Sequence, residues 1–352
     1  MRAFDLCSGI GGFRIGAELS DRGEEFNFVA YSDSDPYANR AYESIFDVSK
    51  EARLEDIQLH TRFEDELGLT GLLPENPDRS DLINKSVPDF DFLFAGFPCQ
   101  PHSLMGNRKG TSDLRGNIFY DIVELIKEKQ PAYFLLENVK AITSVNNGSF
   151  FREIKDVLKN HLGYNLQVWA LNASDFGVPQ TRRRVFFAGS KIRPLLSSPP
   201  YRVKTNSQYP TTWHLLDKNA DIKYYLSENI LKTILKDEHK GYKRKAEINK
   251  LIARPVCKSM HKMHRASQDN YFSEDFITGM FNDEDKTVIL SDIKEPKIRR
   301  ITPAEALKIQ SFPDATVEKL VNSKLSDTRL YMLAGNAVPP LLVKSVINHM
   351  FK

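Results

Sequence analysis

A cysteine directly follows an apolar run in the stretch Ala95-Gly96-Phe97-Pro98-Cys99-Gln100-Pro101-His102-Ser103. The run from Phe90 to Ala95 predicts a buried strand, and the glycine and proline after it end that strand abruptly. In α/β proteins, ligands and reactive groups gather where the strands end. Taken alone, Cys99 could be a small apolar thiol under a turn. The rest of the chain favours a reactive thiol instead.

Apolar runs and helical stripes alternate along much of the chain. A helical stripe is formed by Phe119, Ile122, Val123 and Ile126, and a further helix is expected from Thr302-Pro303 to Ile309. Another is expected after Pro339-Pro340, carrying Leu342, Val343, Val346, Ile347 and Met350. Strands are predicted at 3–7, 26–31, 90–95, 132–136, 165–171 and 184–189. This alternation predicts an α/β fold with a doubly wound, mostly parallel sheet. Residues 58–88 are expected to form a surface excursion with a short helix around Phe63 to Leu67.

Length and composition limit the class of protein. The chain has 352 residues, enough for about two domains, and is 41% hydrophobic and 27% charged, as globular proteins are. We expect a cytoplasmic protein without a membrane segment, because no apolar run approaches about 18 residues and no signal peptide is evident. Cys7, Cys99 and Cys257 are odd in number and widely spaced, so neither a disulfide framework nor a metal site is expected.

A glycine-rich turn follows the first predicted strand. Ser8-Gly9-Ile10-Gly11-Gly12 would let a ligand approach the backbone closely. Arg14 occupies the place of the third glycine of the dinucleotide fingerprint, which disfavours a nicotinamide-dependent oxidoreductase. Asp33 ends the second strand about 20 positions later and suits a pair of ribose hydroxyls. A solvated acidic turn is the alternative interpretation of Asp33.

Charged groups stand beside two further strands. Glu137 follows the strand at 132–136 and is a candidate acid, although a structural glutamate is the alternative. Gln180-Thr181-Arg182-Arg183-Arg184 leads into the strand at 184–189. After Cys99, the segment from Met105 to Gly116 combines glycines with cations and resembles a mobile lid.

The character of the chain changes after Lys191. Prolines at 194, 199 and 200 mark a boundary, and the segment up to about Glu295 mixes cations with aromatic residues. This mixture suits phosphate contacts and base readout, and a solvated basic face is the alternative. We expect a catalytic and cofactor-binding domain at 1–190 plus 328–352, and a smaller target-recognition domain with a hinge at 191–327.

Six motifs together resemble the cytosine-5 DNA methyltransferases of bacterial restriction–modification systems. They occur in the family's order and span nearly the whole chain. The motifs are Asp5-Leu6-Cys7-Ser8-Gly9-Ile10-Gly11-Gly12-Phe13, Gly96-Phe97-Pro98-Cys99-Gln100, Glu137-Asn138-Val139, the triplet Gln180, Arg182 and Arg184, the stretch from Arg300 to Asp314, and Gly335-Asn336-Ala337-Val338-Pro339. The resemblance also implies the S-adenosylmethionine-dependent methyltransferase fold.

The resemblance implies a specific reaction. A cytosine is flipped out of a short site in double-stranded DNA, and the Cys99 thiolate adds to carbon 6 of the ring. Glu137 bonds N3 and the exocyclic amine, while Arg184, with Arg182, holds the carbonyl. Carbon 5 then takes a methyl group from S-adenosylmethionine. The methylated site is thereby protected from a cognate restriction endonuclease.

The resemblance also assigns binding residues. For S-adenosylmethionine they are Cys7, Gly9, Ile10, Gly11, Gly12, Asp33, Asp56, Pro98 and Asn336, with Asp78 or Asp81 as rivals of Asp56 for the adenine amine. For DNA they are Gln100, Ser103, Arg115, Gln180, Lys258, Lys262 and Arg265. The chain departs from the family pattern at Cys7, Ser34, Asp33, His102 and Leu333, which affects the expected cofactor affinity.

Two rival functions use the same fold. A transfer-RNA cytosine methyltransferase would typically carry Cys-Phe-Thr, where this chain has Cys257-Lys258-Ser259. A catalytically silent DNA-binding protein would not need the thiol, the glutamate and the two arginines together. We expect a monomer, because the target cytosine is read on one strand at a time.

Overall fold

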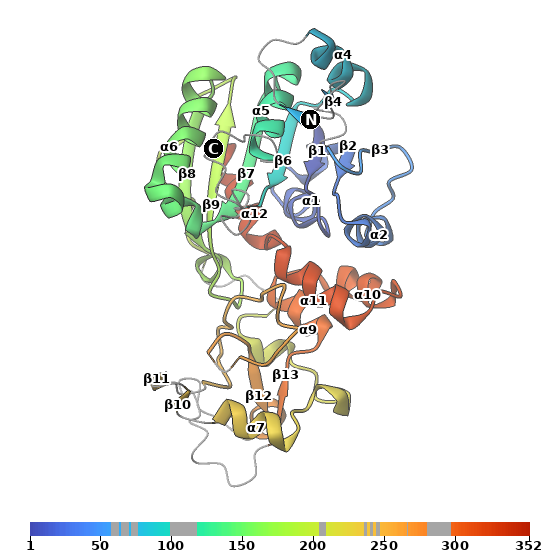
Figure 1. Cartoon of the computed structure of the whole chain (residues 1–352), viewed down its shortest axis with the longest axis vertical. Coiled ribbons are helices and arrows are strands. Elements are labelled where there is room, and N and C mark those ends of the chain that lie inside the picture. The colour runs from blue at the N-terminus through green and yellow to red at the C-terminus, as the bar shows by residue number, and fades with distance from the viewer. Residues whose placement is uncertain are drawn as a thin grey trace. The chain divides into compact units, whose positions relative to one another are not determined.

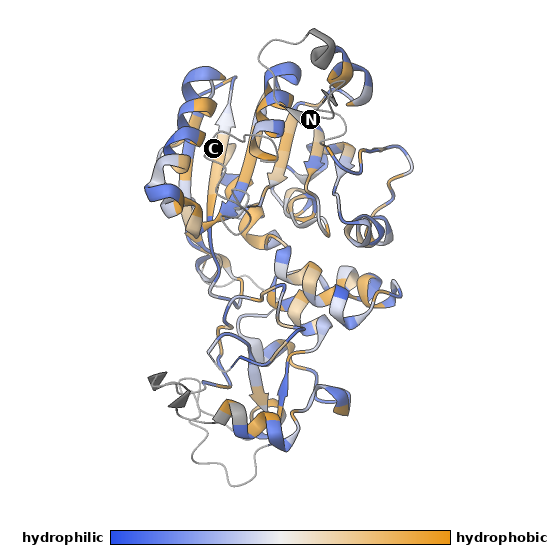
Figure 2. Ribbon diagram, viewed as in Figure 1, coloured by the Kyte–Doolittle hydropathy of each residue, from blue (hydrophilic) through white to orange (hydrophobic). Residues whose placement is uncertain are grey.

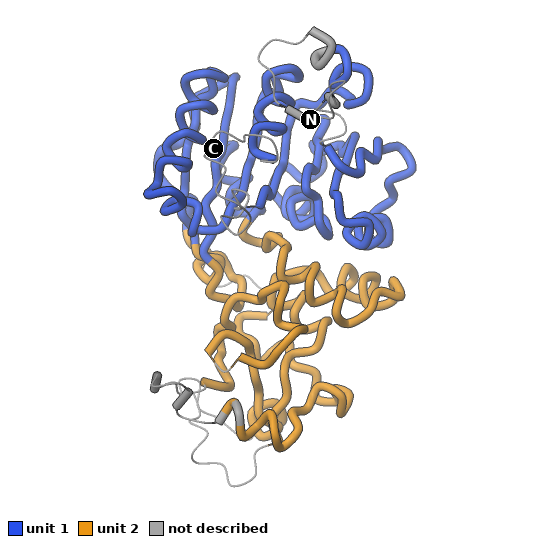
Figure 3. The backbone as a smooth tube through the Cα atoms, viewed as in Figure 1, with its two compact units in different colours: residues 1–171, 183–201, 343–352 blue, residues 172–182, 202–342 orange. Residues whose placement is uncertain are grey.

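The computed structural model contains two compact units, which are distinguished by colour in Figure 3. Unit 1 comprises Met1–Leu171, Arg183–Tyr201 and Val343–Lys352, and unit 2 comprises Asn172–Arg182 and Arg202–Leu342. The structure describes residues 1–57, 63–64, 70–71, 77–98, 118–203, 209–235, 238–239, 242–243, 247–265, 267–279 and 297–352.

A seven-stranded sheet forms the centre of unit 1 (Figure 1). Its strand order is β3-β2-β1-β6-β7-β9-β8. The pairs β1–β2, β1–β6, β2–β3 and β6–β7 are parallel, and β7–β9 is antiparallel. The strands are β1 (Arg2–Leu6), β2 (Asn27–Ser32), β3 (Ala52–Arg53), β6 (Phe92–Gly96), β7 (Tyr133–Val139), β8 (Asn165–Asn172) and β9 (Arg183–Ser190). The predicted α/β fold with a mostly parallel sheet is confirmed.

The apolar strands are buried between polar-faced helices. In Figure 2 the strands of the large sheet are mainly orange, whereas helices beside them carry blue residues. The predicted stripe is confirmed on α5, where Phe119, Ile122 and Ile126 are fully buried. The helices of unit 1 are α1 (Gly12–Glu18), α2 (Pro36–Ile45), α4 (Pro77–Ser86), α5 (Ile118–Lys129), α6 (Ser149–Asp156) and the end of α12 (Pro340–Met350), with short helical turns at Gly23–Glu25, Lys140–Gly148 and Val157–His161.

The surface excursion differs from the prediction. Phe63–Glu64 is a strand, β4, paired antiparallel with β5 (Thr70–Gly71), so the expected helix is wrong at its first two residues. The remainder of that expected helix lies outside the described residues. A strand of two residues is stabilised mainly by pairing with its partner strand. It is too short for its own sequence to show the alternation that predicts a strand. The unpredicted helix α4 begins at Pro77, a favourable residue for a first helical position.

Unit 2 has short strands and helices around a small core. One buried apolar cluster in this unit consists of Leu226, Ile234, Ile248, Tyr271 and Ile298. The predicted helix after Thr302 is confirmed as α9, whose start is stabilised by a capping box between Thr302 and Glu305. The elements are α7 (Glu228–Leu235), β10 (Glu238–His239), β11 (Tyr242–Lys243), β12 (Tyr271–Ser273), α8 (Glu274–Thr278), β13 (Ile298–Arg300), α9 (Pro303–Ile309), α10 (Asp314–Asn322) and α11 (Asp327–Asn336), with turns at Ala173–Phe176, Thr212–Leu215 and Ile222–Tyr224.

The unit boundaries differ from the expected domain boundaries at 190/191 and 327/328. Residues 172–182 and 328–342 belong to unit 2, whereas 191–201 belong to unit 1. The reason lies in buried polar contacts. Gln180 Nε2 donates to Gln310 Oε1 (3.0 Å), and Arg182 Nη1 donates to the Val256 carbonyl (2.9 Å), so this segment is tied to unit 2. The functions expected for the two domains stay predictions.

One stretch of the described chain is apolar and long enough to cross a membrane. Eighteen consecutive residues within Asp327–Met350 have a mean hydropathy of 1.4, but 67% of them are buried inside the protein. The stretch also comprises two helices, because α11 ends at Asn336 and α12 begins at Pro340. Burial of this kind is typical of helices in a protein core.

Candidate active site

The carboxyl ends of three neighbouring strands meet at one edge of the sheet in unit 1. Leu6 pairs with Ala95, and Gly96 pairs with Glu137, so β1 and β6 end close to the level of Glu137 on β7. Phe97 and Pro98 lead the chain out from this edge toward Cys99. The predicted site residues Cys99, Gln100, Ser103 and Arg115 lie outside the described residues. Their roles stay predictions.

Glu137 and Arg184 form an ion pair at this edge. Arg184 Nε lies 2.5 Å from Glu137 Oε1, and the two side chains are only 13% and 11% exposed. Their positions follow from strand register, because Glu137 pairs with Phe186 and Arg184 lies two residues away on the same face of β9. The ideal Cβ position of Gly96 lies 3.7 Å from Glu137 Oε2. The carboxylate therefore borders the chain that carries the cysteine.

Asn138 connects the end of β7 to the end of β6. Its Nδ2 donates to the Phe97 carbonyl (2.8 Å), and its Oδ1 accepts from the Val139 amide (2.8 Å). The Phe97 ring is buried and lies 5.8 Å from the ring of Phe119 on α5. These contacts fix the backbone immediately before Pro98. The sequence motif contained Asn138, but no pattern in the sequence predicted this bond.

The glycine-rich turn also lies at the carboxyl end of β1. Its backbone is in the left-handed region at Cys7 (φ 53°), Gly9 (φ 56°) and Gly11 (φ 74°). A Cβ on Gly11 would lie 2.3 Å from the ring of Phe46, which follows α2, and the left-handed backbone at Gly11 also favours glycine. The Gly9 amide donates to Asp33 Oδ2 (2.9 Å). The turn and the predicted ribose-binding carboxylate are thus in direct contact.

Asp33 is held as a well-oriented carboxylate. Besides the bond from Gly9, its Oδ1 accepts from the Asp35 amide (2.9 Å). Burial raises the pKa of Asp33 above its ordinary value, and the two backbone amides oppose that rise. A carboxylate beside the backbone of a glycine turn fits the ribose hydroxyls of a nucleoside ligand.

Cys7 has the electrostatic surroundings of an inert thiol. Burial raises its pKa well above the ordinary value, and the carboxylates of Asp33 and Asp5 raise the pKa further. Thiolates react as nucleophiles and thiols do not, so Cys7 is no rival for the role predicted for Cys99. Its place in the glycine turn agrees instead with a wall of the cofactor site.

Arg14 supports the glycine turn through two ion pairs and a contact with the ring of Phe46. Its Nη1 lies 2.7 Å from Glu51 Oε1, and its Nε lies 2.9 Å from Glu18 Oε1. The guanidinium also lies 4.1 Å from the centroid of Phe46, the ring that packs on Gly11. Only the mismatch of Arg14 with a dinucleotide fingerprint was visible in the sequence. Its supporting role depends on partners far along the chain.

The acidic residues predicted as candidates for the adenine amine differ in their surroundings. Ser32 Oγ donates to the carbonyls of Leu54 (2.9 Å) and Glu55 (3.0 Å), which ties the preceding backbone to the end of β2. The charge of Asp56 also raises the pKa of Asp33. Asp81 is instead a surface residue on α4, with a side chain 72% exposed and paired to Lys85. The side chain of Asp78 lies outside the described set.

Other predicted site residues belong to unit 2. Asn336 is exposed at the end of α11, and Gln180 and Arg182 are buried. Lys258 and Lys262 are exposed, in agreement with a DNA-contacting role. Arg265 is engaged with Asp269, whose Oδ1 lies 2.9 Å from Arg265 Nη2.

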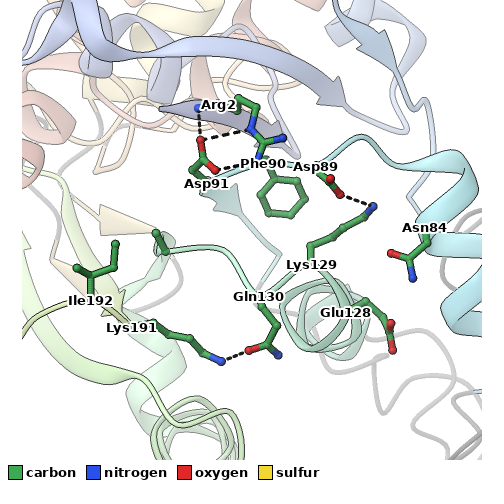
Figure 4. A pocket seen from close by; sticks show the side chains of 11 residues that line it. Arg2, Asn84, Asp89, Phe90, Asp91, Glu128, Lys129, Gln130, Lys191 and Ile192 are labelled. Atoms are coloured by element: carbon green, nitrogen blue, oxygen red, sulfur yellow. Dashed lines mark hydrogen bonds and ion pairs between the residues drawn. The ribbon is translucent and has the colours of Figure 1, made fainter.

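A polar pocket lies at the opposite, amino end of the sheet (Figure 4). Its volume is about 470 Å³. Arg2 pairs with Asp91, Lys129 with Asp89, and Lys191 with Gln130, so its walls are held by internal contacts. Within the described part of the chain, no group of three or more His, Cys, Asp or Glu residues could hold a metal ion. The predicted catalytic and cofactor-binding residues that the structure describes in unit 1 lie instead at the carboxyl ends of the parallel strands.

Comparison with known proteins agrees with this geometry. The family model for C-5 cytosine-specific DNA methylases matches residues 1–352. The chain belongs to this family. Its curated relatives include the type II methyltransferases M.NgoBI of Neisseria gonorrhoeae, 32% identical over 96% of this chain and 89% of the relative, and M.HpaII of Haemophilus parainfluenzae, 31% identical over 95% and 84%. Membership confirms the predicted family and the predicted DNA (cytosine-5)-methyltransferase activity.

Solved structures confirm the fold of this DNA methylase. The Dnmt2 methyltransferase of S. pombe matches with a TM-score of 0.71 and 19% identity, covering 100% of this chain and 98% of that one. The Entamoeba histolytica methyltransferase EhMeth matches with a TM-score of 0.70, 19% identity and the same coverage. At this identity the likeness concerns the fold alone.

Proposed function

We propose that this DNA methylase forms a covalent adduct between Cys99 and a cytosine flipped out of a short duplex site. The observation that supports the proposal is the Glu137–Arg184 ion pair beside the strand end that leads to Cys99. A carboxylate and a guanidinium held together at such an edge present an acceptor and a planar donor side by side. A cytosine ring offers the matching groups: an amine, N3 and a carbonyl.

In this mechanism the Cys99 thiolate adds to carbon 6, and the ring electrons move toward carbon 5. Glu137 bonds N3 and the exocyclic amine, which stabilises the charge that develops in the ring. Arg184 binds the cytosine carbonyl, the contact first predicted for Arg184 with Arg182. After methyl transfer, a base removes the carbon 5 proton, the Cys99–carbon 6 bond breaks, and the thiolate is restored. Because a stacked base is out of reach, the cytosine must leave the duplex first.

The residues at the glycine turn fit S-adenosylmethionine as the methyl donor. When bound, S-adenosylmethionine supplies an electrophilic methyl group. Asp33 would hold the ribose hydroxyls, and the backbone from Cys7 to Gly12 would line the methionine and ribose part. We assign Asp56 to the adenine amine, Pro98 to the pocket wall, and Asn336 to the methionine end.

The biological role follows from this chemistry. We propose that the enzyme works as a cytoplasmic monomer on double-stranded DNA and protects one short site from a cognate endonuclease. Gln100, Ser103, Arg115, Lys258 and Lys262 would contact the DNA. Exposed cations such as the two lysines bind phosphates, whereas specificity comes from base contacts.

Expression in a methylation-deficient bacterium, followed by sequencing of its DNA for 5-methylcytosine, tests the proposal. Cells with the wild type should carry the modification at one short motif, and cells with Cys99→Ser should carry none. The Cys257→Ser variant is the matched control, because no role is assigned to the Cys257 thiol, and it should keep the modification. A well-folded wild type that leaves the DNA unmethylated would contradict the proposal and direct attention to RNA substrates. Equal methylation by Cys99→Ser would contradict the assigned nucleophile.

A further inference from the structure

Both backbone groups of Val256 in unit 2 are held by side chains from the Gln180–Arg182 segment. The Val256 amide donates to Gln180 Oε1 (2.7 Å), and the Val256 carbonyl accepts from Arg182 Nη1 (2.9 Å). The two side chains are almost completely buried, at 0% and 2% exposure. Two buried side chains that hydrogen-bond the amide and the carbonyl of one residue fix the position of its backbone.

The same two side chains are anchored to the chain around α11. Arg182 Nη2 donates to the carbonyls of Gly335 (2.8 Å) and Ala337 (3.0 Å). Gln180 Nε2 donates to Gln310 Oε1 (3.0 Å), and Gln310 Nε2 donates in turn to the Ala334 carbonyl (2.5 Å). Three separate parts of the sequence are thus joined through two side chains.

Backbone contacts bring these parts still closer together. The Thr181 amide donates to the Ala253 carbonyl, and the Ala253 amide donates to the Pro179 carbonyl, each at 2.9 Å. A Cβ on Gly335 would lie 2.1 Å from the Lys258 amide nitrogen, so only glycine permits this approach. The backbone at 253–258 therefore has little freedom to shift.

A compact turn with exposed cations follows Val256. The Met260 amide donates to the Cys257 carbonyl (3.1 Å), and the Lys262 amide donates to the Ser259 carbonyl (3.0 Å). Lys258 and Lys262 are exposed on this turn. At its far side Arg265 is paired with Asp269. We refer to residues 257–262 as the cationic turn.

We propose that Gln180 and Arg182 are positioning residues that clamp Val256 and thereby set where the cationic turn meets DNA. This inference rests on the proposed function, in which Lys258 and Lys262 bind phosphates. It gives Gln180 and Arg182 roles other than the DNA contact and the cytosine contact expected from the resemblance. The effect on DNA passes through the backbone of Val256.

The chemistry of the clamp explains the residue types. Arginine offers several donors in a planar fork and can reach three carbonyls, whereas the single ammonium of lysine cannot. Glutamine supplies an acceptor for the Val256 amide and a donor for Gln310 at once. Replacement by glutamate keeps the acceptor and removes the donor.

Hydrogen exchange and salt-dependent DNA binding of the full chain test the clamp. For Arg182→Lys we expect amide exchange at 256–262 to accelerate at least tenfold. The slope of log affinity against log salt should fall by up to about 2, because each lost phosphate contact removes about 0.9. Gln180→Glu should show the same changes to a smaller extent.

Arg299→Lys is the matched control. Arg299 is an equally buried arginine of unit 2, paired with Glu305 at 2.7 Å and not bonded to Val256. This variant should lose stability while the exchange of 256–262 and the salt slope stay as in the wild type.

Three outcomes would overturn the proposal. In the first, both clamp variants keep wild-type exchange and slope. In the second, Arg299→Lys changes the slope as much as Arg182→Lys does. In the third, Arg182→Lys loses methyl transfer while amide exchange at 256–262 and DNA affinity stay as in the wild type. That result would indicate that Arg182 acts directly in catalysis. A wild type that binds DNA without methylating it contradicts the proposed function, yet the exchange and slope still test the clamp.

Discussion

Glu137 and Arg184 show how much of the chemistry depends on individual residues. Each partly shields the other from water, so neither charge is left alone at the edge of the sheet. In the proposed reaction the Glu137 carboxylate stabilises the protonated cytosine ring more strongly than the neutral ring of the bound substrate. Stronger binding of the transition state than of the substrate is the requirement for catalysis. Replacement of the carboxylate by an amide keeps its shape and removes its charge.

We predict that Glu137→Gln slows methyl transfer by about 10²- to 10⁴-fold, because a general acid or base contributes that much. Single-turnover rates at saturating DNA and methyl donor measure the loss, and DNA affinity should stay near that of the wild type. Glu43→Gln is the control, since Glu43 pairs with Arg53 at the surface. A rate within a few-fold of the wild type would remove Glu137 from the reaction.

A second prediction concerns Cys7 and pH. Its folded-state pKa is raised, so the folded chain holds this proton more tightly than the unfolded chain does. The resulting stability is present below the unfolded pKa of about 8.5 and is lost as the pH rises through the folded pKa. Denaturant titrations should show that Cys7→Ala loses less stability at alkaline pH than the wild type does. Parallel curves for the two proteins would contradict the buried-thiol account.

The motif residues of unit 1 could be predicted from the sequence because they are chemically distinctive and occur in a recognisable order. Asn138 and Arg14 could not be given roles, because their partners Phe97 and Glu51 lie about 40 positions away along the chain. Such long-range pairs depend on strand register and packing, which a single sequence does not display.

At the scale of elements, the ends of β6 and β7 act as one unit. Asn138 links them, so the backbone before Cys99 depends on a side chain of the neighbouring strand. We expect Asn138→Ala to lower stability by about 1–3 kcal/mol, because the Phe97 carbonyl would lose a buried donor.

The same variant should lower the maximal rate more than it weakens DNA binding. Single-turnover kinetics and thermal unfolding measure the two effects. Asn270→Ala is the matched control, because Asn270 is also buried and its Nδ2 also donates to a backbone carbonyl, that of Arg254. If the two variants lose equal stability and equal rate, Asn138 has no special part in placing the cysteine.

The strands and α5 could be predicted because a buried parallel strand and an amphipathic helix have characteristic periods. The strand at Phe63–Glu64 could not, since its apolar content is too small to show a period. Likewise α4 has only a weakly apolar face, which explains why residues 77–86 appeared to be irregular.

At the scale of the whole molecule, charge location matters more than net charge. The net charge is only +3, yet Lys258 and Lys262 stand exposed on a turn whose backbone is firmly held. We predict that Lys258→Ala reduces the salt slope of DNA binding by about 1. Lys250→Ala, which removes a lysine paired with Glu247, should leave the slope unchanged. Equal slopes for all three proteins would exclude Lys258 from the interface.

The two units of the structure have other boundaries than the two domains expected from the sequence. Prolines after Lys191 suggested a border there, whereas the buried contacts of Gln180 and Arg182 assign residues 172–182 to unit 2. Composition can reveal where a chain changes character. It cannot reveal which distant backbone groups a buried arginine will bind.

Covalent trapping tests the central claim most directly. A duplex containing the recognised site with 5-fluorocytosine at the target position is incubated with the enzyme and S-adenosylmethionine. Fluorine cannot leave carbon 5 as a proton does, so the Cys99 adduct should persist and be seen by mass spectrometry on the peptide that contains Cys99. The account predicts that adduct for the wild type, none for Cys99→Ser, and much slower formation for Glu137→Gln. Methylation of normal DNA without any such adduct would contradict it.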